Sequence, residues 1–321
     1  MERFSLCSDT GLHLEGITLG ATLTSLTVPV DGAARQVLLG CPDEEYARQQ
    51  VWLGAVAGRF ANRIGDATLE RHGERWSLDA NQPPHCLHGG AQGFHRREWT
   101  IAGQERDRVR LTLLSPDAEQ GFPGNMAVSL EYRLEGNTLL IAFEARSDRA
   151  TPVSLTSHAY FNLDGGGDVR HHRLTLKADR YLPTRPDGIP TVPTGVEGVF
   201  DLRQGRRLLD GWGSHPQQRQ AKGYDHAYLL TPREDWHARL LSGDGRLAME
   251  LWSDQPSLQL YTGNWLTGTP GREGEYRDHE GICLEAQQVP DSPNRPELGN
   301  PWLEAGGIYR HHTRLRFLPT P

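Results

Sequence analysis

The sequence predicts an all-β fold in the form of one large antiparallel β-sandwich. Apolar residues alternate with polar ones in many short segments, as they do in strands with one buried face. Glycine and proline, with 36 and 21 residues, separate these segments at short intervals. Helical periodicity is scarce along the chain. Together these observations favour a sandwich or a barrel over a mixed fold.

Two β-hairpins are the clearest elements. Apolar residues spaced by two run through 126–143 and are interrupted by Gly136 and Asn137. The stretch 238–251 alternates in the same way on both sides of a Gly-Asp-Gly turn. Short turns of this composition between alternating segments are typical of antiparallel hairpins. Shorter alternating segments lie at 109–113, 174–176 and 315–317.

Helices and domain boundaries give weaker signals. Short helices are expected at 43–50 and 206–212. No linker, composition shift or fixed repeat divides the chain. A length of about 150 residues per domain would suggest two domains, but large all-β folds often run longer as one. We therefore expect a single domain over residues 1–321.

The composition argues against nucleic-acid and membrane partners. The net charge is −7, whereas nucleic-acid binders usually carry a basic surface. No apolar run approaches the roughly 20 residues of a membrane helix, and the N-terminus lacks the pattern of a signal peptide. The four cysteines form no C-x-x-C pair, which fits a reducing compartment. We expect a cytoplasmic protein that is a monomer or a homodimer.

Three predicted strands carry unusual polar groups opposite an apolar face. In 281–287 the polar face holds Glu285, in 151–161 it holds His158, and in 258–261 it holds Gln259. If these strands are neighbours, the three side chains converge on one concave surface suited to sugar hydroxyls. The alternative for each strand is an ordinary solvated face, which is common in antiparallel sheets.

Three loops add candidate binding residues. Asn62 and Arg63 lie in 58–64, between an apolar run and a turn. His88 precedes a pair of glycines that allow close backbone approach. Asp225 lies in a Gly-Tyr-Asp-His segment, where an aspartate often bonds only its own backbone. Surface or turn roles remain the alternatives for all of them.

The histidine pairs 171–172 and 311–312 do not predict a metal site. Adjacent residues of a strand point to opposite faces, so such a pair rarely binds one ion. No other histidine grouping has the spacing of a ligand set. The carboxylates of Asp225 and Glu285 allow a second interpretation, the acid and base of a glycosidase, which depends on a separation that the sequence does not give.

Several motifs in a fixed order carry a family resemblance. They are GRFANRI, LHGG, SHAYFNLDG, GYDHAYLL, LQLYTGNW and LEAQQVPDSPNRPEL, with the shorter VLLG, PTG and FDL and a closing strand at 309–317. In this order they resemble the aldose 1-epimerases, the galactose mutarotases. The resemblance extends over nearly the whole chain, from Thr18 to Phe317.

The resemblance implies a fold, an activity and a set of site residues. The fold would be the β-supersandwich of galactose mutarotases, with a sugar in an open cleft on one sheet. Glu285 would be the general base, His158 the general acid and His88 a second active-site histidine, while Arg63 would bind the sugar. Further sugar-contacting positions would be Asn62, Asp225 and Gln259. A free aldohexose such as D-galactose or D-glucose would be the substrate, and no metal or organic cofactor is expected.

Two departures from the family pattern leave substrate preference open. Ser157 precedes the acid histidine where the family often has asparagine, and 298–300 replaces a more usual aromatic-proline segment. Related alternatives are a hexose-6-phosphate 1-epimerase, which would need additional basic residues at the cleft, and a non-catalytic carbohydrate-binding protein of the same fold. The presence of both Glu285 and His158 speaks against the latter.

Anomer exchange requires the C1 hydroxyl to lose a proton while the ring oxygen gains one. Glu285 as carboxylate would take the first proton, and His158 as imidazolium would give the second. Opposite charges close together favour both ionised forms, so we expect the two groups to support each other. The rate would then be bell-shaped in pH, with Glu285 on the acidic limb and His158 on the basic limb.

Overall fold

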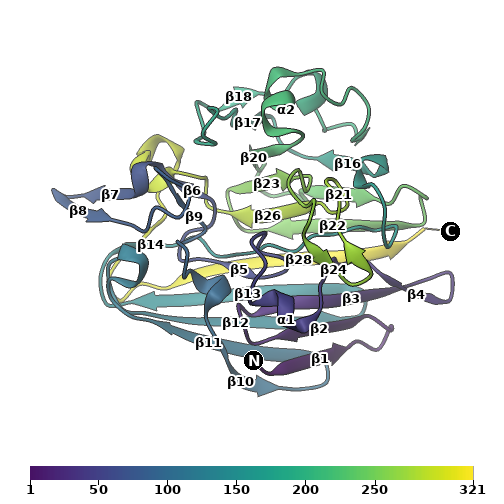
Figure 1. The fold of residues 1–321 in the computed structure, drawn as a ribbon, viewed down its shortest axis with the longest axis horizontal. Helices are drawn as coiled ribbons and strands as arrows, with labels where there is room; N and C mark the ends of the chain where they lie inside the picture. Colours follow the sequence, from purple (N-terminus) through teal and green to yellow (C-terminus); the bar gives the residue numbers. More distant parts are fainter. Residues whose placement is uncertain (321) are drawn as a thin grey trace.

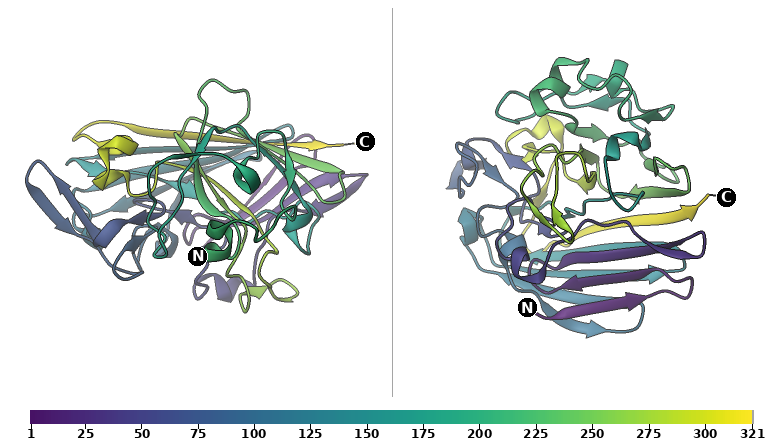
Figure 2. Two further views of the ribbon diagram at one scale, coloured as in Figure 1. Left: turned by 90° about the horizontal axis from the view of Figure 1, so that it is seen from above. Right: turned by 45° about the vertical axis from the view of Figure 1, so that its right-hand side comes forward.

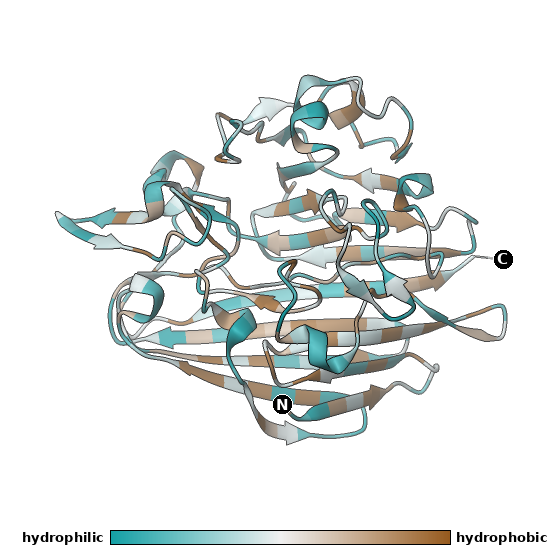
Figure 3. Ribbon diagram, viewed as in Figure 1, coloured by the Kyte–Doolittle hydropathy of each residue, from teal (hydrophilic) through white to brown (hydrophobic). Residues whose placement is uncertain are grey.

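A nine-stranded antiparallel sheet forms one layer of the computed structural model, which describes residues 1–320 (Figure 1). Its strands, in order across the sheet, are β10 (Thr100–Gln104), β11 (Arg108–Ser115), β12 (Met126–Glu135), β13 (Thr138–Ser147), β28 (Tyr309–Pro319), β22 (Leu247–Ser253), β21 (Ala238–Leu241), β16 (Arg173–Leu176) and β19 (Arg206–Arg207). Apolar and polar residues alternate visibly along its long strands (Figure 3). One face of the sheet is therefore apolar.

Two smaller sheets cover that apolar face (Figure 2). One consists of β1 (Arg3–Cys7), β2 (His13–Ile17), β3 (Thr22–Val30) and β4 (Ala33–Gln36). The other runs in the order β18 (Thr194–Gly195), β17 (Arg180–Tyr181), β20 (Asp225–Leu229), β23 (Ser257–Tyr261) and β26 (Cys283–Gln287). The side chains between the layers form one hydrophobic cluster that draws residues from Phe4 to Phe317. This arrangement confirms the predicted antiparallel sandwich.

The remaining elements are short. Two-stranded pairs join β5 (Val56–Ala57) to β15 (Thr156–Ser157), β6 (Arg63–Ile64) to β9 (Cys86–Leu87), β7 (Thr68–Arg71) to β8 (Glu74–Ser77), β14 (Thr151–Pro152) to β27 (Trp302–Leu303), and β24 (Pro270–Gly271) to β25 (Gly274–Glu275). The α-helices are α1 (Asp43–Tyr46) and α2 (Pro216–Ala221), and the 3₁₀ turns are η1 (Gly65–Ala67), η2 (Phe94–Arg96), η3 (Glu119–Gly121), η4 (Val169–His171), η5 (Gly198–Phe200), η6 (Ser292–Asn294) and η7 (Pro296–Leu298). Within residues 1–320 no helix is long and apolar enough to cross a membrane.

Both predicted hairpins are confirmed. β12 pairs with β13 in a register that sets Glu135 opposite Thr138, so Gly136 and Asn137 form the turn. β21 pairs with β22 around the predicted glycine-rich turn. The three shorter alternating segments lie within β11, β16 and β28. Alternation of period two therefore located seven of the nine strands of the large sheet, all except β10 and β19 at its two edges.

The helix predictions were less accurate. The helix expected at 43–50 shortens to α1, which ends at Tyr46. The helix expected at 206–212 is wrong, because its first two residues form β19 and pair with β16 at the sheet edge. No pattern in the sequence predicted α2. Its N-cap is His215, whose side chain accepts a hydrogen bond from the Gln217 backbone amide, with proline at the first helical position.

The segment 151–161 is not the single strand that its alternation predicts. Only its β14 and β15 portions are paired as strands. The rest of the segment crosses the interior and changes partner, and Phe161 bridges Ile282 just before β26. Nearly every residue of the segment is buried. Because protein lies on both sides, the polar residues of the segment do not mark a solvated face.

The sandwich makes a testable prediction about stability. Leu130 is fully buried in the middle of β12, whereas Leu114 of β11 is 74% exposed. Leu130→Ala should lower the free energy of unfolding by about 2–5 kcal/mol, since it removes buried methyl groups and leaves a cavity. Leu114→Ala, the matched control, should change it by less than about 0.5 kcal/mol. Urea denaturation measures both values, and equal effects would contradict the layer assignment.

Candidate active site

The register of three adjacent strands brings polar side chains together. β23 lies between β20 and β26, and Gln259 of β23 is directly opposite Glu285 of β26. The Nε2 amide of Gln259 donates a hydrogen bond of 2.6 Å to Oδ1 of Asp225 on β20. Side chains that are opposite or diagonal across strands share one face of a sheet. The five-stranded sheet therefore presents two carboxylates and an amide on its outer face.

His158 reaches the same place from a separate segment. Its backbone amide donates to the Ala55 carbonyl, and its own carbonyl accepts from the Gly54 amide, so the chain near β5 holds it on both sides. The Nε2 atom of His158 lies 3.7 Å from Oε1 of Glu285. This separation is too long for a hydrogen bond. Both atoms therefore remain free to bond a third group in the space they face.

His88 is locked by Asn62. The Asn62 backbone amide donates to Nδ1 of His88 over 3.1 Å, and the His88 amide donates back to the Asn62 carbonyl. A side chain at Gly89 would bring its Cβ within 1.9 Å of the Gly58 carbonyl oxygen, which explains the glycine that follows the histidine. Because Nδ1 accepts a hydrogen bond, neutral His88 carries its proton on Nε2.

These side chains open into one cleft with a cavity of about 290 Å³. Its lining residues are Gln50, Val51, Trp52, Asn62, Arg63, Gln82, Leu87, His88, His158, Tyr160, Asp225, Tyr261, Trp265 and Glu285. All of the site residues predicted from the sequence belong to this lining except Gln259, which holds Asp225 instead. The two departures from the family pattern, Ser157 and 298–300, are outside it.

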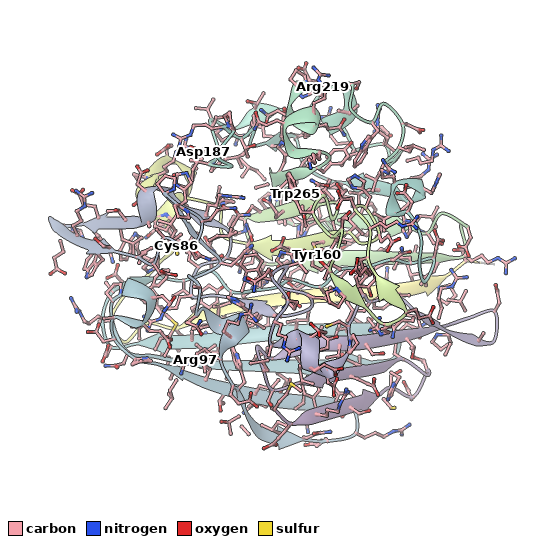
Figure 4. All side chains as sticks on the ribbon, in the orientation of Figure 1. Cys86, Arg97, Tyr160, Asp187, Arg219 and Trp265 are labelled. Carbon is pink, nitrogen blue, oxygen red and sulfur yellow. The ribbon has the colours of Figure 1, made fainter. Side chains whose placement is uncertain are left out.

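Aromatic residues of the cleft are the main part of the site that the sequence did not predict. The Trp52 ring lies 4.8 Å from the His88 ring and 6.3 Å from that of His158, between ring centroids. Tyr160 lies 5.0 Å from His158, and Trp265 at the rim is 57% exposed (Figure 4). Tyr160 shares the predicted polar face of His158, which was a usable signal. The place of Trp52 depends on a loop conformation that no local pattern indicates.

Burial controls the acid–base properties of the central pair. Glu285 and His158 are 2% and 4% exposed. Burial raises the pKa of Glu285 well above its usual value, the negative charge of Asp225 raises it further, and Arg63 opposes both effects. Burial lowers the pKa of His158 to about 4. The expectation that the pair favours both ionised forms is therefore wrong, because loss of hydration outweighs the attraction between the two charges.

Three ligand-type atoms meet in the cleft, from His88, His158 and Glu285, all within 4.8 Å of one another. Two histidines and a carboxylate are a common metal-binding set. A metal at Nε2 of His88 would need the lone pair of that atom, but the hydrogen bond from Asn62 to Nδ1 places a proton there. The arrangement therefore suits a hydrogen-bond donor better than a metal ligand.

The adjacent histidine pairs have structural roles. In the first pair, Nε2 of His172 accepts from the Leu163 amide in the interior. In the second pair, His311 is buried and its Nδ1 lies 2.8 Å from the Leu155 carbonyl oxygen, while His312 bonds Asp254 on the surface. The two members of this pair point to opposite faces of β28, as expected for neighbours on a strand.

Comparison with known proteins places this geometry in a family context. The family model described as aldose 1-epimerase matches residues 2–316. The aldose 1-epimerase of Escherichia coli K12 is 40% identical over 328 residues, covering 98% of this chain and 94% of that one. The human galactose mutarotase is 38% identical over 327 residues, with 99% and 94% covered.

Solved structures agree with the sequence comparisons. A homologue of aldose epimerases from Caenorhabditis elegans superposes with a TM-score of 0.94 at 26% identity, covering 100% of this chain and 99% of that one. The galactose 1-epimerase of Lactobacillus acidophilus gives a TM-score of 0.89 at 28% identity, covering 99% and 94%. Fold, sequence and motif order thus agree over the full length, and the chain belongs to the aldose 1-epimerase family.

Proposed function

We propose that the protein interconverts the α- and β-anomers of a free, uncharged aldohexose such as D-galactose or D-glucose. The observation that carries the proposal is the facing pair of Glu285 and His158, 3.7 Å apart and buried at the base of the cleft. One carboxyl and one imidazole at this distance can act on two neighbouring oxygens of one sugar, O1 and the ring oxygen. Membership of the aldose 1-epimerase family supports the same chemistry.

The charges of the cleft favour a neutral sugar over a sugar phosphate. Apart from the histidines, Arg63 is the one basic side chain among the described residues that line it. Asp225 and Glu285 add two carboxyl groups to the same wall. A phosphate carries nearly two negative charges and is usually bound by several basic groups or backbone amides. The hexose-6-phosphate alternative is therefore disfavoured.

Ring opening needs two proton transfers and no other chemistry. Glu285 as carboxylate takes the proton of the C1 hydroxyl, His158 as imidazolium gives a proton to the ring oxygen, and the bond from C1 to that oxygen breaks. Rotation about the C1–C2 bond exposes the other face of the aldehyde. Re-closure then proceeds with the two roles reversed.

The pair holds one proton throughout this cycle. In the empty cleft, burial favours the proton on Glu285 and a neutral His158. The reactive form, with a carboxylate and an imidazolium, has the same number of protons and differs by one transfer between the two groups. Sugar hydroxyls that donate to the carboxylate stabilise that form, since hydrogen bonding to a charged group favours its charged state.

The other polar groups of the cleft have binding roles in this proposal. Nε2 of His88 donates a hydrogen bond toward the reacting oxygens. Arg63, Asn62 and Asp225 bind hydroxyls away from C1. Gln259 acts through Asp225, whose carboxylate it fixes with a 2.6 Å hydrogen bond.

Location and assembly remain predictions. The net charge of −7 and the unpaired cysteines are consistent with a cytoplasmic protein without a nucleic-acid partner. Whether the chain is a monomer or a homodimer is a question for size-exclusion chromatography with light scattering. Neither property affects the proposed chemistry, because every group it uses comes from one chain.

Glu285→Gln tests the base. The substitution keeps the shape of the side chain but removes its ability to accept a proton, so mutarotation of α-D-galactose should slow by at least about a hundred-fold. Polarimetry measures the rate, and circular dichroism confirms the fold. Galactose binding by calorimetry should persist. Near-wild-type turnover in the folded variant would contradict the proposed role of Glu285.

The pH profile tests which group titrates on which limb. The rate should be bell-shaped, because activity requires one proton on the pair. Acid adds a second proton as His158, with a pKa of about 4, becomes imidazolium. Base removes the last proton, and the raised pKa of Glu285 moves that limb above the usual carboxyl range. The assignment is the reverse of the sequence-based expectation, and both limbs belong to the coupled pair.

His158→Asn checks this assignment. The variant should lose most of the rate, and the residual activity, which depends on the carboxylate of Glu285 alone, should rise with pH through the raised pKa of Glu285 and lack the basic limb. Polarimetry across the pH range in buffers of constant ionic strength gives both limbs. A basic limb that persists in this variant would show that another group titrates there.

Chelation tests the absence of a metal requirement. Dialysis against a chelator should leave the mutarotation rate unchanged, because the protonated Nε2 of His88 leaves the cleft without a third metal ligand. A parallel sample dialysed without chelator controls for loss of protein. Activity that falls and returns with a divalent ion would overturn this prediction.

A further inference from the structure

Arg63 is held at one edge of its guanidinium group. Its Nε donates a hydrogen bond of 2.7 Å to Oε1 of Gln82. Its backbone carbonyl accepts from the Asp291 amide, which fixes the main chain of β6. Among residues 1–320, Gln82 is the one hydrogen-bond partner of the guanidinium. The terminal nitrogens Nη1 and Nη2 are therefore available to a ligand in the cleft.

The loop 184–190 makes a second contact with the same guanidinium group. Gly188 has a positive φ of 83°, and a Cβ built there would lie 2.6 Å from both Cζ and Nε of Arg63 and 3.0 Å from Nη1. The Gly188 backbone therefore lies directly against the guanidinium plane. Glycine is required twice at this position, for the backbone conformation and for the close contact.

The loop is well anchored. Gln217 accepts a hydrogen bond from the Thr184 amide, and Gln220 donates to the carbonyls of Thr184 and Arg185. Nη1 of Arg295 donates to the Pro190 carbonyl at the other end of the loop. Both ends of the loop are thus tied to neighbouring elements, which makes it a fixed support.

Arg63 needs this support because its guanidinium group has open space on more than one side. A second cavity of about 340 Å³ lies beside the cleft, and Arg63, Gln82, Asp225 and Trp265 line both. Gly188 and Asp187 line the second cavity (Asp187 is labelled in Figure 4). An arginine side chain has many rotamers, and ordering it costs up to about 2 kcal/mol. Without lateral contacts, the guanidinium has room to turn away from the sugar.

We propose that Gln82 and Gly188 are positioning residues that hold the Arg63 guanidinium in the orientation in which Nη1 and Nη2 face the sugar. The inference rests on the proposed function of the cleft. Gln82 fixes Nε by a hydrogen bond, and Gly188 blocks rotation toward the second cavity by contact. The two residues are far apart in the sequence, but both act on the guanidinium group of Arg63.

Arg63 also acts on the charge of the reacting pair. Its positive charge lowers the pKa of Glu285 and of Asp225 against the effect of burial. The charged and titratable groups around Glu285 are His158, His88, Asp225, Arg63, Tyr160, Cys283 and Tyr261. Displacement of Arg63 should therefore move the basic limb of the pH profile upward, an effect that a general loss of stability would not produce.

Two single variants test the proposal. Gln82→Met keeps the length of the side chain and removes the acceptor, and Gly188→Ala pushes the guanidinium aside. Each should lower kcat/KM by roughly ten-fold or more, as expected for a misplaced hydrogen bond from a charged group, mainly through KM, and raise the basic limb. Gly73→Ala is the matched control, since Gly73 has a φ of 82° and a Cβ added there would meet nothing within 4 Å. It should leave kcat/KM and the pH profile unchanged.

A double-mutant cycle shows whether the effects pass through Arg63. Arg63→Ala should make both single variants nearly silent, because the group that they position is gone. Losses that add fully to that of Arg63→Ala would overturn the proposal, as would wild-type KM and pH profile in Gln82→Met. The same cycle is measured on galactose affinity by calorimetry. A wild-type chain that binds galactose without mutarotation would refute the proposed function alone, while the affinity cycle would still decide the roles of Gln82 and Gly188.

Discussion

The burial of Glu285 and His158 at the base of the cleft is the constraint on which the site depends. Both groups are almost fully buried, and this burial moves each pKa toward its neutral form. Charges so placed interact strongly, because the surroundings are less polarisable than water. The exact placement of the neighbouring charges, Asp225 and Arg63, therefore decides which protonation states are populated.

The sandwich provides that placement because its second layer is divided. The four-stranded sheet and the five-stranded sheet cover the same apolar face of the large sheet, and the outer face of the five-stranded sheet is left for the cleft. Glu285, Gln259 and Asp225 stand on adjacent strands in a fixed register. The loops add His88 and Arg63, and hydrogen bonds from Asn62 and to Gln82 orient these in turn. The strands position the reacting carboxylate, and loops held by hydrogen bonds position the groups that surround it.

Local patterns in the sequence predicted the features that local backbone geometry determines, namely the strands and the faces on which their side chains lie. Alternation of period two located the hairpins of the large sheet and the faces of Glu285 and Gln259. Alternation did not predict the path of 151–161 through the interior. A segment that is buried on both sides can alternate in polarity without having a face in solvent. The contact between Gly188 and Arg63 joins residues far apart in the chain, and no spacing rule encodes it. The direction of the pKa shifts also required the structure, since charge attraction and burial act in opposite senses and only the degree of burial decides between them.

The shared proton explains why so deep a burial is compatible with turnover. During ring opening the carboxylate gains one proton from O1 and the imidazolium gives one to the ring oxygen. During re-closure each group recovers its original state. The pair therefore returns to its starting protonation without exchange with solvent. A reaction with net uptake or release of a proton would need a proton path to solvent, but anomer exchange does not, so the pair can lie buried at the base of the cleft beside Trp52, Tyr160 and Tyr261 with both groups poised for either direction.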